Sequence, residues 1–95
     1  MIRLFARIEF KEVPNDNLYG RLHSYMESRN WRRSITGSNG MTMQLPRWTY
    51  QESFDDDVDC LAVADELKFQ IESHVSKRAT VLVIKAKSWG FASPS

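Results

Sequence analysis

Residues 31–50 read WRRSITGSNGMTMQLPRWTY, and this stretch decides the fold. Two runs that contain aromatic and β-branched residues flank Gly37-Ser38-Asn39-Gly40, and an Asn-Gly pair between such runs is a strong hairpin signal. Residues 31–36 and 41–50 are therefore predicted to form two antiparallel strands. Pro46 has no N–H to donate to a neighbouring strand, so it requires an edge position, a bulge or an early strand end.

Helical periodicity appears on both sides of this hairpin. Before it, apolar residues recur at Leu18, Leu22, Tyr25 and Met26, which predicts a helix ending near residues 29–30. The Asn and Asp residues at 15–17 suit the start of that helix. After the hairpin, residues 53–57 offer caps and acids for a second helix that ends near residue 76. Its apolar stripe is Leu61, Ala64, Leu67, Ile71 and Val75, and Phe69 lies off it.

Strands are predicted at the outer ends of this pattern. Residues 2–10 alternate, with the even-numbered side chains apolar, as in a half-buried strand. Residues 80–86 are rich in β-branched side chains, and the apolar run 81–84 favours a central, well-covered strand. Strand, helix, hairpin, helix, strand is the split βαβ order. We therefore predict an α+β, ferredoxin-like βαββαβ domain over residues 1–88, with a four-stranded antiparallel sheet and two helices on one face. Residues 89–95 are predicted to be a flexible tail, unless its aromatics dock on Phe69.

Composition fits one small globular domain. The 95 residues are 42% hydrophobic and 26% charged, which is ordinary for a folded chain. No apolar run approaches the roughly 20 residues that span a bilayer, and the alternating N-terminus differs from a signal peptide. A single cysteine, Cys60, excludes an internal disulfide. We expect a soluble cytoplasmic protein that does not contact a membrane.

Charge is distributed unevenly along the chain. The formal net charge is +1, yet residues 21–33 hold four arginines and one glutamate, a local charge of +3. Residues 52–66 hold seven acids and no base. A chain polarised in this way can present a basic face to an anion while remaining near neutral overall. The simpler interpretation of either block alone is a solvated surface.

Metal and nucleophile chemistry find little support in the sequence. Cys60, His23 and His74 do not have zinc-ligand spacing, and the acidic residues 55–59 are better explained as helix caps than as magnesium ligands. Neither a G-x-S-x-G nucleophile motif nor a phosphate-binding glycine loop is present. We predict no metal site and no cofactor.

RNA binding is the chemistry that the residues support best. Guanidinium groups can bind phosphates bidentately, and exposed aromatic rings can stack on unpaired bases. On the predicted sheet face away from the helices, Arg3, Phe5 and Arg7 would add to such a surface. Without a family argument, the simpler alternative places the aromatics in the core and leaves the arginines to solubilise the surface. The candidate RNA-binding residues are Arg29, Trp31, Arg32, Arg33, Arg47 and Trp48.

His23 and Arg21 are the candidate catalytic residues. On a helical wheel His23 borders the apolar face of the first helix, and Arg21 lies on the opposite flank. An imidazole, which gains and loses a proton near neutral pH, could accept a proton from a ribose 2′-hydroxyl. The alternative is that His23 covers an edge of the core.

The first half of the chain resembles the GhoS family, the protein antitoxins of type V toxin–antitoxin systems. The matching segments are Arg7-Ile8-Glu9, Leu22-His23 with Met26, Trp31 through Thr36, the hairpin Gly37–Gly40, and Gln44-Leu45-Pro46 through Tyr50. The resemblance implies a ferredoxin-like, metal-independent endoribonuclease that cuts the single-stranded messenger RNA of a small membrane toxin. It also implies a departure, because His23, with Arg21 beside it, stands where the family has an arginine tied to cleavage.

A second hypothesis belongs to a different functional class. The chain could be a non-catalytic module that binds a protein partner or forms a homodimer. Phe5, Phe69, Trp89 and Phe91 would then be contact aromatics, and the acidic residues 52–66 would face a basic partner.

Overall fold

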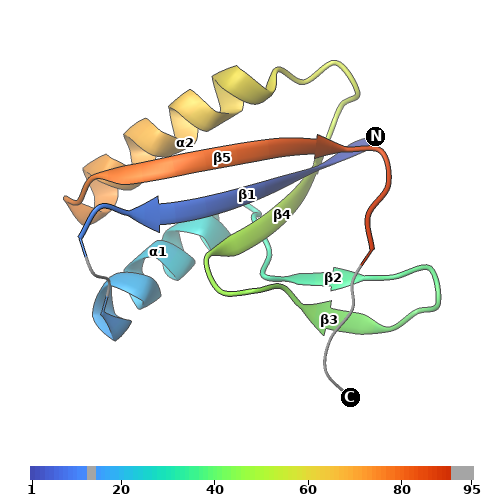
Figure 1. Cartoon of the computed structure of the whole chain (residues 1–95), viewed down its shortest axis with the longest axis horizontal. Helices are drawn as coiled ribbons and strands as arrows, with labels where there is room; N and C mark the ends of the chain where they lie inside the picture. Colours follow the sequence, from blue (N-terminus) through green and yellow to red (C-terminus); the bar gives the residue numbers. More distant parts are fainter. Residues whose placement is uncertain (13–14, 91–95) are drawn as a thin grey trace.

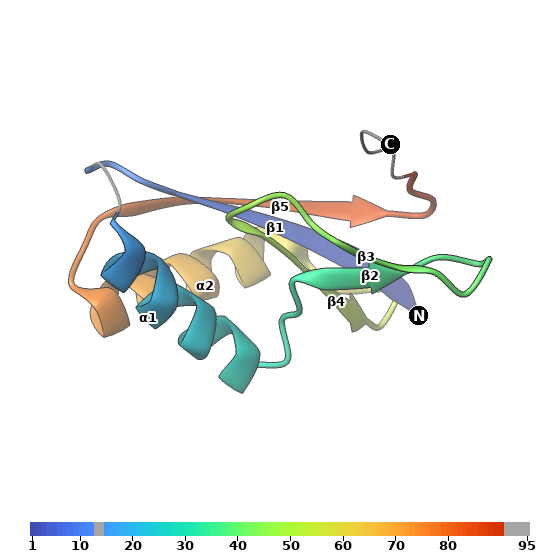
Figure 2. The same cartoon turned by 90° about the horizontal axis from the view of Figure 1, so that it is seen from below.

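Among the residues that the computed structural model describes, 1–12 and 15–90, the chain forms two helices and five strands. Strand β1 pairs antiparallel with β4 on one side and β5 on the other, and β2 and β3 form a separate antiparallel hairpin. Both helices cover the same face of the three-stranded sheet, and the hairpin extends away from it (Figures 1 and 2). The elements are β1 (Ile2–Phe10), α1 (Asp16–Ser28), β2 (Ser34–Thr36), β3 (Thr42–Gln44), β4 (Thr49–Phe54), α2 (Cys60–Val75) and β5 (Ala79–Ala86).

The predicted α+β domain with an antiparallel sheet and two helices on one face is confirmed, but the sheet is built differently. Pro46 ends the returning run early and separates it into β3 and β4. Beside β4, where a fourth full strand was predicted, Arg32 forms an isolated bridge and exchanges two 2.9 Å backbone hydrogen bonds with Gln51. The chain then turns away from the sheet, so β2 pairs with β3.

The core lies between the inner face of the sheet and the two helices. Leu4, Ala6 and Ile8 of β1 are completely buried, which confirms the alternation predicted for this strand. Leu22 of α1 and Ile71 of α2 are likewise completely buried against them. Each such large aliphatic side chain contributes about 1.5–3 kcal/mol through its removal from water.

The helix ends follow local capping chemistry. Asn15 Oδ1 accepts a 2.8 Å hydrogen bond from the Leu18 N–H and starts α1 as predicted. Asp59 caps α2 by accepting from the Leu61 N–H at 3.0 Å. The predicted cap at 53–57 lies too early, because β4 continues through Phe54. Ser76 ends α2 with a φ of 58°.

Strand β5 was predicted to be central and well covered, and this prediction is wrong. It lies at an edge of the sheet, in the order β4-β1-β5. Leu82 and Ile84 are 53% and 51% exposed, because both helices cover the opposite face. An apolar run signals double-sided burial only when both faces are covered. Leu61, predicted to lie on the buried stripe of α2, is also exposed.

The end of the described chain does not reach Phe69. Trp89 lies beside Met1, Arg3 and Lys85, and Phe69 remains exposed on α2. Phe91 and the rest of the predicted flexible tail fall outside the described residues, as do residues 13–14. Neither described helix combines the length and the apolar character needed to cross a membrane.

Glu72 ties α2 to the start of β5 and provides a test of the fold. Its carboxylate accepts hydrogen bonds from Lys68 Nζ and from the Ala79 N–H, both at 2.8 Å. The bond from Lys68, followed by that from Ala79, lowers the pKa of Glu72. The folded state is therefore favoured above the ordinary glutamate pKa of about 4.3, and this stability is lost as the pH falls through the lowered folded value.

We predict that Glu72→Gln lowers the thermal unfolding midpoint at neutral pH and that its difference from the wild type narrows in acid. Circular dichroism melts at pH 7 and at roughly pH 3 measure both quantities. Glu66→Gln, at an exposed position on the same helix, is the matched control. An equal loss for Glu72→Gln at both pH values would contradict an ionic role for this carboxylate.

Candidate functional site

One flank of α1 carries three polar side chains at helical spacing. Tyr19, His23 and Glu27 follow one another at intervals of four residues, so they lie on one side of the helix. His23 Nε2 lies 3.0 Å from Glu27 Oε1, and the Tyr19 and His23 rings are inclined by 25° with centroids 6.5 Å apart. The side chain of His23 is 16% exposed and that of Glu27 is 63% exposed. The carboxylate is therefore the solvent-facing member of this pair.

Tyr50 of β4 lies behind His23. The two rings are inclined by 22° with centroids 6.3 Å apart. Within the described chain, neither the buried Tyr50 hydroxyl nor the buried His23 Nδ1 has a hydrogen-bond partner. Burial raises the pKa of Tyr50 above its usual range, Tyr19 and Glu27 raise it further, and Arg33 opposes them. Tyr50 therefore remains a neutral phenol that can donate a hydrogen bond.

Two arginines converge on Tyr19 from different parts of the chain. Arg33 Nη1 donates to the Tyr19 hydroxyl at 3.4 Å. The Arg47 guanidinium carbon lies 4.4 Å from the centre of the Tyr19 ring, in a cation–π contact. We call Tyr19, His23, Glu27, Arg33 and Arg47 the Tyr19 cluster. It combines two guanidinium groups with a histidine–carboxylate pair.

Trp48 holds the turn that presents Arg47. Its backbone has a φ of 69°, which is unfavourable for a bulky side chain. The indole packs edge-on against Tyr19 and Phe10, with centroid distances of 4.4 and 5.8 Å. The Trp48 carbonyl accepts a 2.9 Å hydrogen bond from the Ile8 N–H. These contacts offset a backbone strain of about 1–3 kcal/mol.

A shallow cleft of about 420 Å³ adjoins the Tyr19 cluster, between the end of α1 and the base of the β2–β3 hairpin. Arg32 and Arg33 supply positive charge to it, and the side chains of Asn30 and Gln44 supply amide groups. Such a lining suits an anion. Glu27 and Arg33 belong to both the cleft and the cluster. The lining residues are Glu27, Asn30, Trp31, Arg32, Arg33, Ser34 and Gln44.

The predicted catalytic pair does not come together. His23 belongs to the Tyr19 cluster, whereas Arg21 lies on the other flank of α1 and donates to the His74 carbonyl at 3.1 Å. Arg29 also lies on the side of α1 that faces α2, with its guanidinium carbon 5.8 Å from the Tyr25 ring centre. Neither of these two arginines lines the cleft.

The predicted RNA-binding residues divide in the same way. Arg32 and Arg33 line the cleft, and Arg47 and Trp48 lie at the adjoining turn. Trp31 is 3% exposed and packs on Phe54 in the core. Its ring therefore has no free face to stack on a base, so the core alternative holds for this tryptophan.

Three residues of the site escaped the sequence analysis. Tyr19 and Glu27 are four residues before and after His23, so helical spacing alone could have grouped them with it. Tyr50 could not be found in this way, because it approaches His23 from a distant strand. The hydrogen bond between Arg33 and Tyr19 likewise joins residues that only folding brings together.

The outer face of the sheet is less available to phosphate than predicted. Arg3 is hydrogen-bonded through Nη1 to the Gln51 side chain, and Arg7 Nε lies 3.5 Å from Glu9 Oε1. Phe5 lies between them on β1 and is half-buried. The guanidinium groups on this face are engaged with neighbouring side chains, as Arg47 is with Asp16 Oδ1 at 3.3 Å.

No group of three or more His, Cys, Asp and Glu side chains in residues 1–12 and 15–90 is arranged to hold a metal ion. No protein-family model matches the chain, and no curated protein matches it significantly.

Tyr50→Phe tests the state of the buried phenol. A buried polar group without a partner costs roughly 1–3 kcal/mol. Removing the hydroxyl is therefore expected to raise the free energy of unfolding by about 1 kcal/mol, measured by urea denaturation. Tyr19→Phe, which removes a hydroxyl that is hydrogen-bonded to Arg33, should not stabilise the protein. Destabilisation by Tyr50→Phe would mean that its hydroxyl is satisfied in solution.

Proposed function

We propose that this protein is a GhoS-like antitoxin that acts in the cytoplasm as a metal-independent endoribonuclease on single-stranded messenger RNA of a small membrane toxin. The observation that carries the catalytic part is the His23–Glu27 pair, which stands beside Arg33 at the edge of an arginine-lined cleft. The RNA target rests on the resemblance of residues 2–50 to that family.

The proposed fold is ferredoxin-like with a reduced fourth strand. The order β4-β1-β5, with Arg32 bridged to the outer side of β4, supports this assignment. In this interpretation the fourth strand has shrunk to one bridge, and the β2–β3 hairpin has grown out of the sheet. The hairpin then forms one wall of the cleft.

The cleft supplies the groups that RNA binding requires. Arg32 and Arg33 would contact backbone phosphates, and the half-buried Trp48 with Arg47 offers an aromatic and cationic surface for an adjoining base. A single strand suits this site, because its phosphates can follow a shallow surface and its bases are free to turn outward.

Proton transfer in the proposed reaction belongs to the His23–Glu27 pair. The ribose 2′-hydroxyl loses its proton to the pair and its oxygen bonds to phosphorus. The bond from phosphorus to the 5′-oxygen breaks, the departing oxygen takes up a proton from water, and the pair releases its proton to solvent. The products are a 2′,3′-cyclic phosphate and a 5′-hydroxyl. Arg33 stabilises the added charge on the phosphate.

The two members of the pair have different roles in the proposed reaction, because the Glu27 side chain is more exposed than that of His23. Glu27 reaches the cleft, whereas His23 Nε2 is turned toward the Glu27 carboxylate. Glu27 is therefore the group that first meets the 2′-hydroxyl. His23 orients the carboxylate and shares the proton that it receives.

His23→Ala is expected to reduce RNA cleavage by roughly 10²–10⁴-fold while leaving RNA binding nearly intact. The assay incubates the purified protein with uridine- and adenine-rich single-stranded transcripts in EDTA and follows the fragments on gels. Arg21→Ala is the control, because this arginine lies on the same helix but on the opposite flank. Undiminished cutting by His23→Ala would rule out the proposed role.

Binding should depend on salt in proportion to the arginines that meet phosphate. Three contacts from Arg32, Arg33 and Arg47 predict a slope of about −2 when log K is plotted against log salt. Arg33→Ala should reduce the magnitude of this slope by about 0.7. Fluorescence anisotropy with a labelled single strand measures it. If Arg21→Ala reduces the slope as much, phosphate binds on the other flank of α1.

The non-catalytic interaction module retains support from one observation. Leu82 and Ile84 remain half exposed on the outer face of β5, away from the cleft. If the protein neither binds RNA at low salt nor cuts it, binding of a partner through this surface becomes its expected function.

A further inference from the structure

The cleft beside the Tyr19 cluster adjoins two further cavities. A cavity of about 270 Å³ shares Asn30 and Arg32 with the cleft. A larger cavity, of about 700 Å³, shares Arg3 and Ser53 with the smaller one. We call these two cavities the Arg3 groove, because Arg3 lines both. The cleft and the Arg3 groove therefore form one continuous series of hollows, which leads from α1 to the end of β5.

The pairing of the strands places the arginines of the groove on the outer face of the sheet. Arg32 is bridged to Gln51 of β4, which pairs in turn with Phe5 of β1. Residues that pair directly across neighbouring strands point to the same face, and Arg3 lies two residues before Phe5 on the same side of its strand. Arg32 and Arg3 therefore both face away from the helices, on either side of Gln51.

Gln51 positions Arg3 without neutralising it. The Gln51 side chain is buried; its Oε1 accepts a hydrogen bond from Arg3 Nη1, and its Nε2 donates to the Ser34 carbonyl at 2.7 Å. An amide carries no charge, so this bond leaves the positive charge of Arg3 in place, whereas Arg7 is paired with Glu9. A guanidinium group has five N–H donors, so one bond to Gln51 leaves others for a phosphate.

Positive charge exceeds negative charge along the whole path of cleft and groove. Within residues 1–12 and 15–90, none of its five cationic side chains forms an ion pair. Of the three acids that line it, Glu27 pairs with His23, and Asp56 pairs with the Met1 amino group at 3.3 Å. Burial raises the pKa of the third, Glu52, and so disfavours its charged form. The cations are Arg3, Arg32, Arg33, Lys85 and Lys87.

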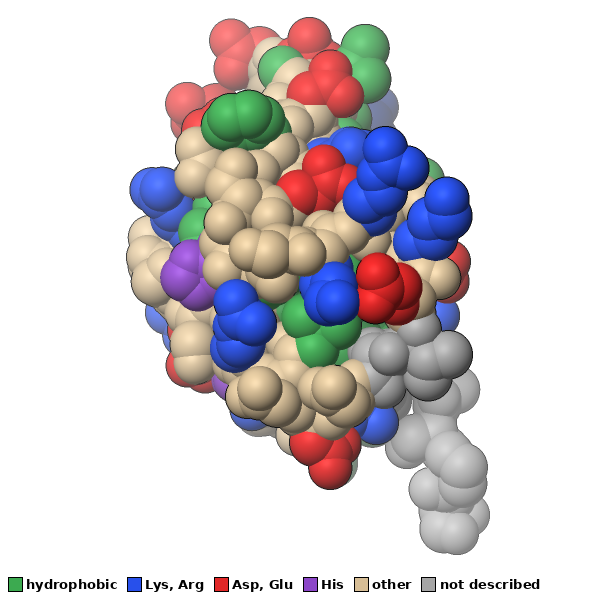
Figure 3. Space-filling view, turned by 90° about the vertical axis from the view of Figure 1, so that its left-hand side faces the viewer, with side chains coloured by type: hydrophobic (Ala, Val, Ile, Leu, Met, Phe, Trp, Pro, Cys, Tyr) green, Lys and Arg blue, Asp and Glu red, His purple; other side chains and the backbone are tan. Residues whose placement is uncertain are grey.

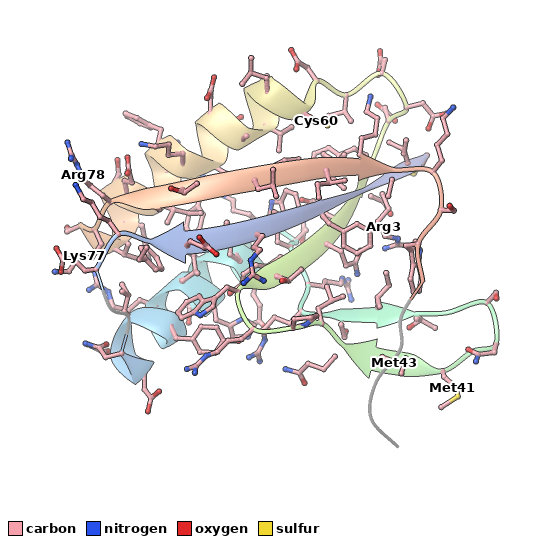
Figure 4. All side chains as sticks on the ribbon, in the orientation of Figure 1. Arg3, Met41, Met43, Cys60, Lys77 and Arg78 are labelled. Carbon is pink, nitrogen blue, oxygen red and sulfur yellow. The ribbon has the colours of Figure 1, made fainter. Side chains whose placement is uncertain are left out.

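The opposite end of the molecule differs in this respect. Lys77 and Arg78 lie there, at the other end of the sheet from Arg3 (Figure 4). Lys77 Nζ is 2.9 Å from Glu12 Oε2, and Figure 3 shows basic and acidic side chains interspersed over this end. The charges at this end are mixed, whereas those along the path are mainly positive.

Trp89 stands at the far end of the path. It lines the larger cavity of the groove together with Arg3 and Lys87, and it is 37% exposed. Lys85 lines the same cavity and donates to the Asp56 backbone carbonyl at 3.1 Å, which does not neutralise its charge. Sites for single-stranded nucleic acid combine cations that follow the backbone with aromatic rings on which bases stack. The end of the path provides both.

We propose that a single strand of RNA bound in the cleft continues along the Arg3 groove and stacks a base on Trp89. Arg3 and Lys87 contact its phosphates along the way. This inference rests on the proposed function, since the strand enters the groove from the proposed site of cleavage. It assigns a second binding subsite to the chain, and it predicts that a strand must extend beyond the cleft to bind with full affinity.

Two lengths of RNA distinguish the groove from the cleft. A strand of about four nucleotides has three phosphates, which Arg32, Arg33 and Arg47 can all engage, whereas a strand of about twelve nucleotides also reaches the groove. Both strands are 2′-O-methylated, so that no 2′-hydroxyl is available for cleavage, and fluorescence anisotropy measures their binding to the full chain. We expect tighter binding of the long strand, with a salt slope of about −3.5 against about −2 for the short strand.

Trp89→Ala is expected to weaken binding of the long strand by roughly fivefold or more, because it removes the ring on which a base stacks, and to leave the short strand unaffected. Phe69→Ala removes an exposed ring from α2 and should change neither. Lys87→Gln should reduce the magnitude of the slope for the long strand by about 0.7, whereas Lys77→Gln, at the opposite end, should not. Circular dichroism establishes that each variant is folded.

The outcomes separate this proposal from the proposed function. If the wild type binds both strands but Trp89→Ala weakens neither, or weakens both equally, the groove is not part of the RNA path and the cleft alone binds RNA. An equal effect of Phe69→Ala on the long strand would also overturn the proposal. If the wild type binds neither strand at low salt, the proposed function fails, and the groove loses its ligand with it.

Discussion

The packing of β1 against both helices is the contact on which the rest of the structure depends. β1 is the middle strand, and it supplies the fully buried Leu4, Ala6 and Ile8 to the core. Its two neighbours, β4 and β5, are far apart in sequence and meet the same strand. Because both helices cover the inner face of this sheet, Leu82 and Ile84 on the outer face remain about half exposed to solvent. The position of α1 on β1 also determines what its polar flank can contact.

The polar flank of α1 forms a site because two segments that are distant from it along the chain pack against it. Arg33 follows α1 after a short connection, whereas Arg47 and Trp48 arrive through the turn before β4. All three contact Tyr19. The Trp48 backbone strain lies at this point of the fold, as does the Tyr50 hydroxyl, which has no hydrogen-bond partner among the described residues. Features that cost stability at one location are typical of a binding or catalytic site, where the local structure serves something other than folding.

Prediction from the sequence succeeded where the signal was local. The alternation of residues 2–10, the Asn15 cap and the end of α2 near residue 76 each depend on neighbouring residues, and each is confirmed. Prediction failed where the packing of one structural layer on another determines which side chains are buried. The apolar run of β5 gave no indication that its outer face lacks a covering layer. Trp31 was grouped with the arginines that follow it, yet its ring turned into the core.

The sequence by itself determined the periodicities, the helix caps and the residue types available for chemistry, because these follow from neighbours within a few positions along the chain. The sequence also indicated that His23 borders the apolar face of the first helix. Tertiary structure alone decided that Arg33 and Arg47 accompany His23 while Arg21 and Arg29 do not. It likewise decided that β5 is an edge strand. The physical reason is that a helix has two flanks and a sheet has two faces, and only the packing of the remaining elements determines which of them is covered.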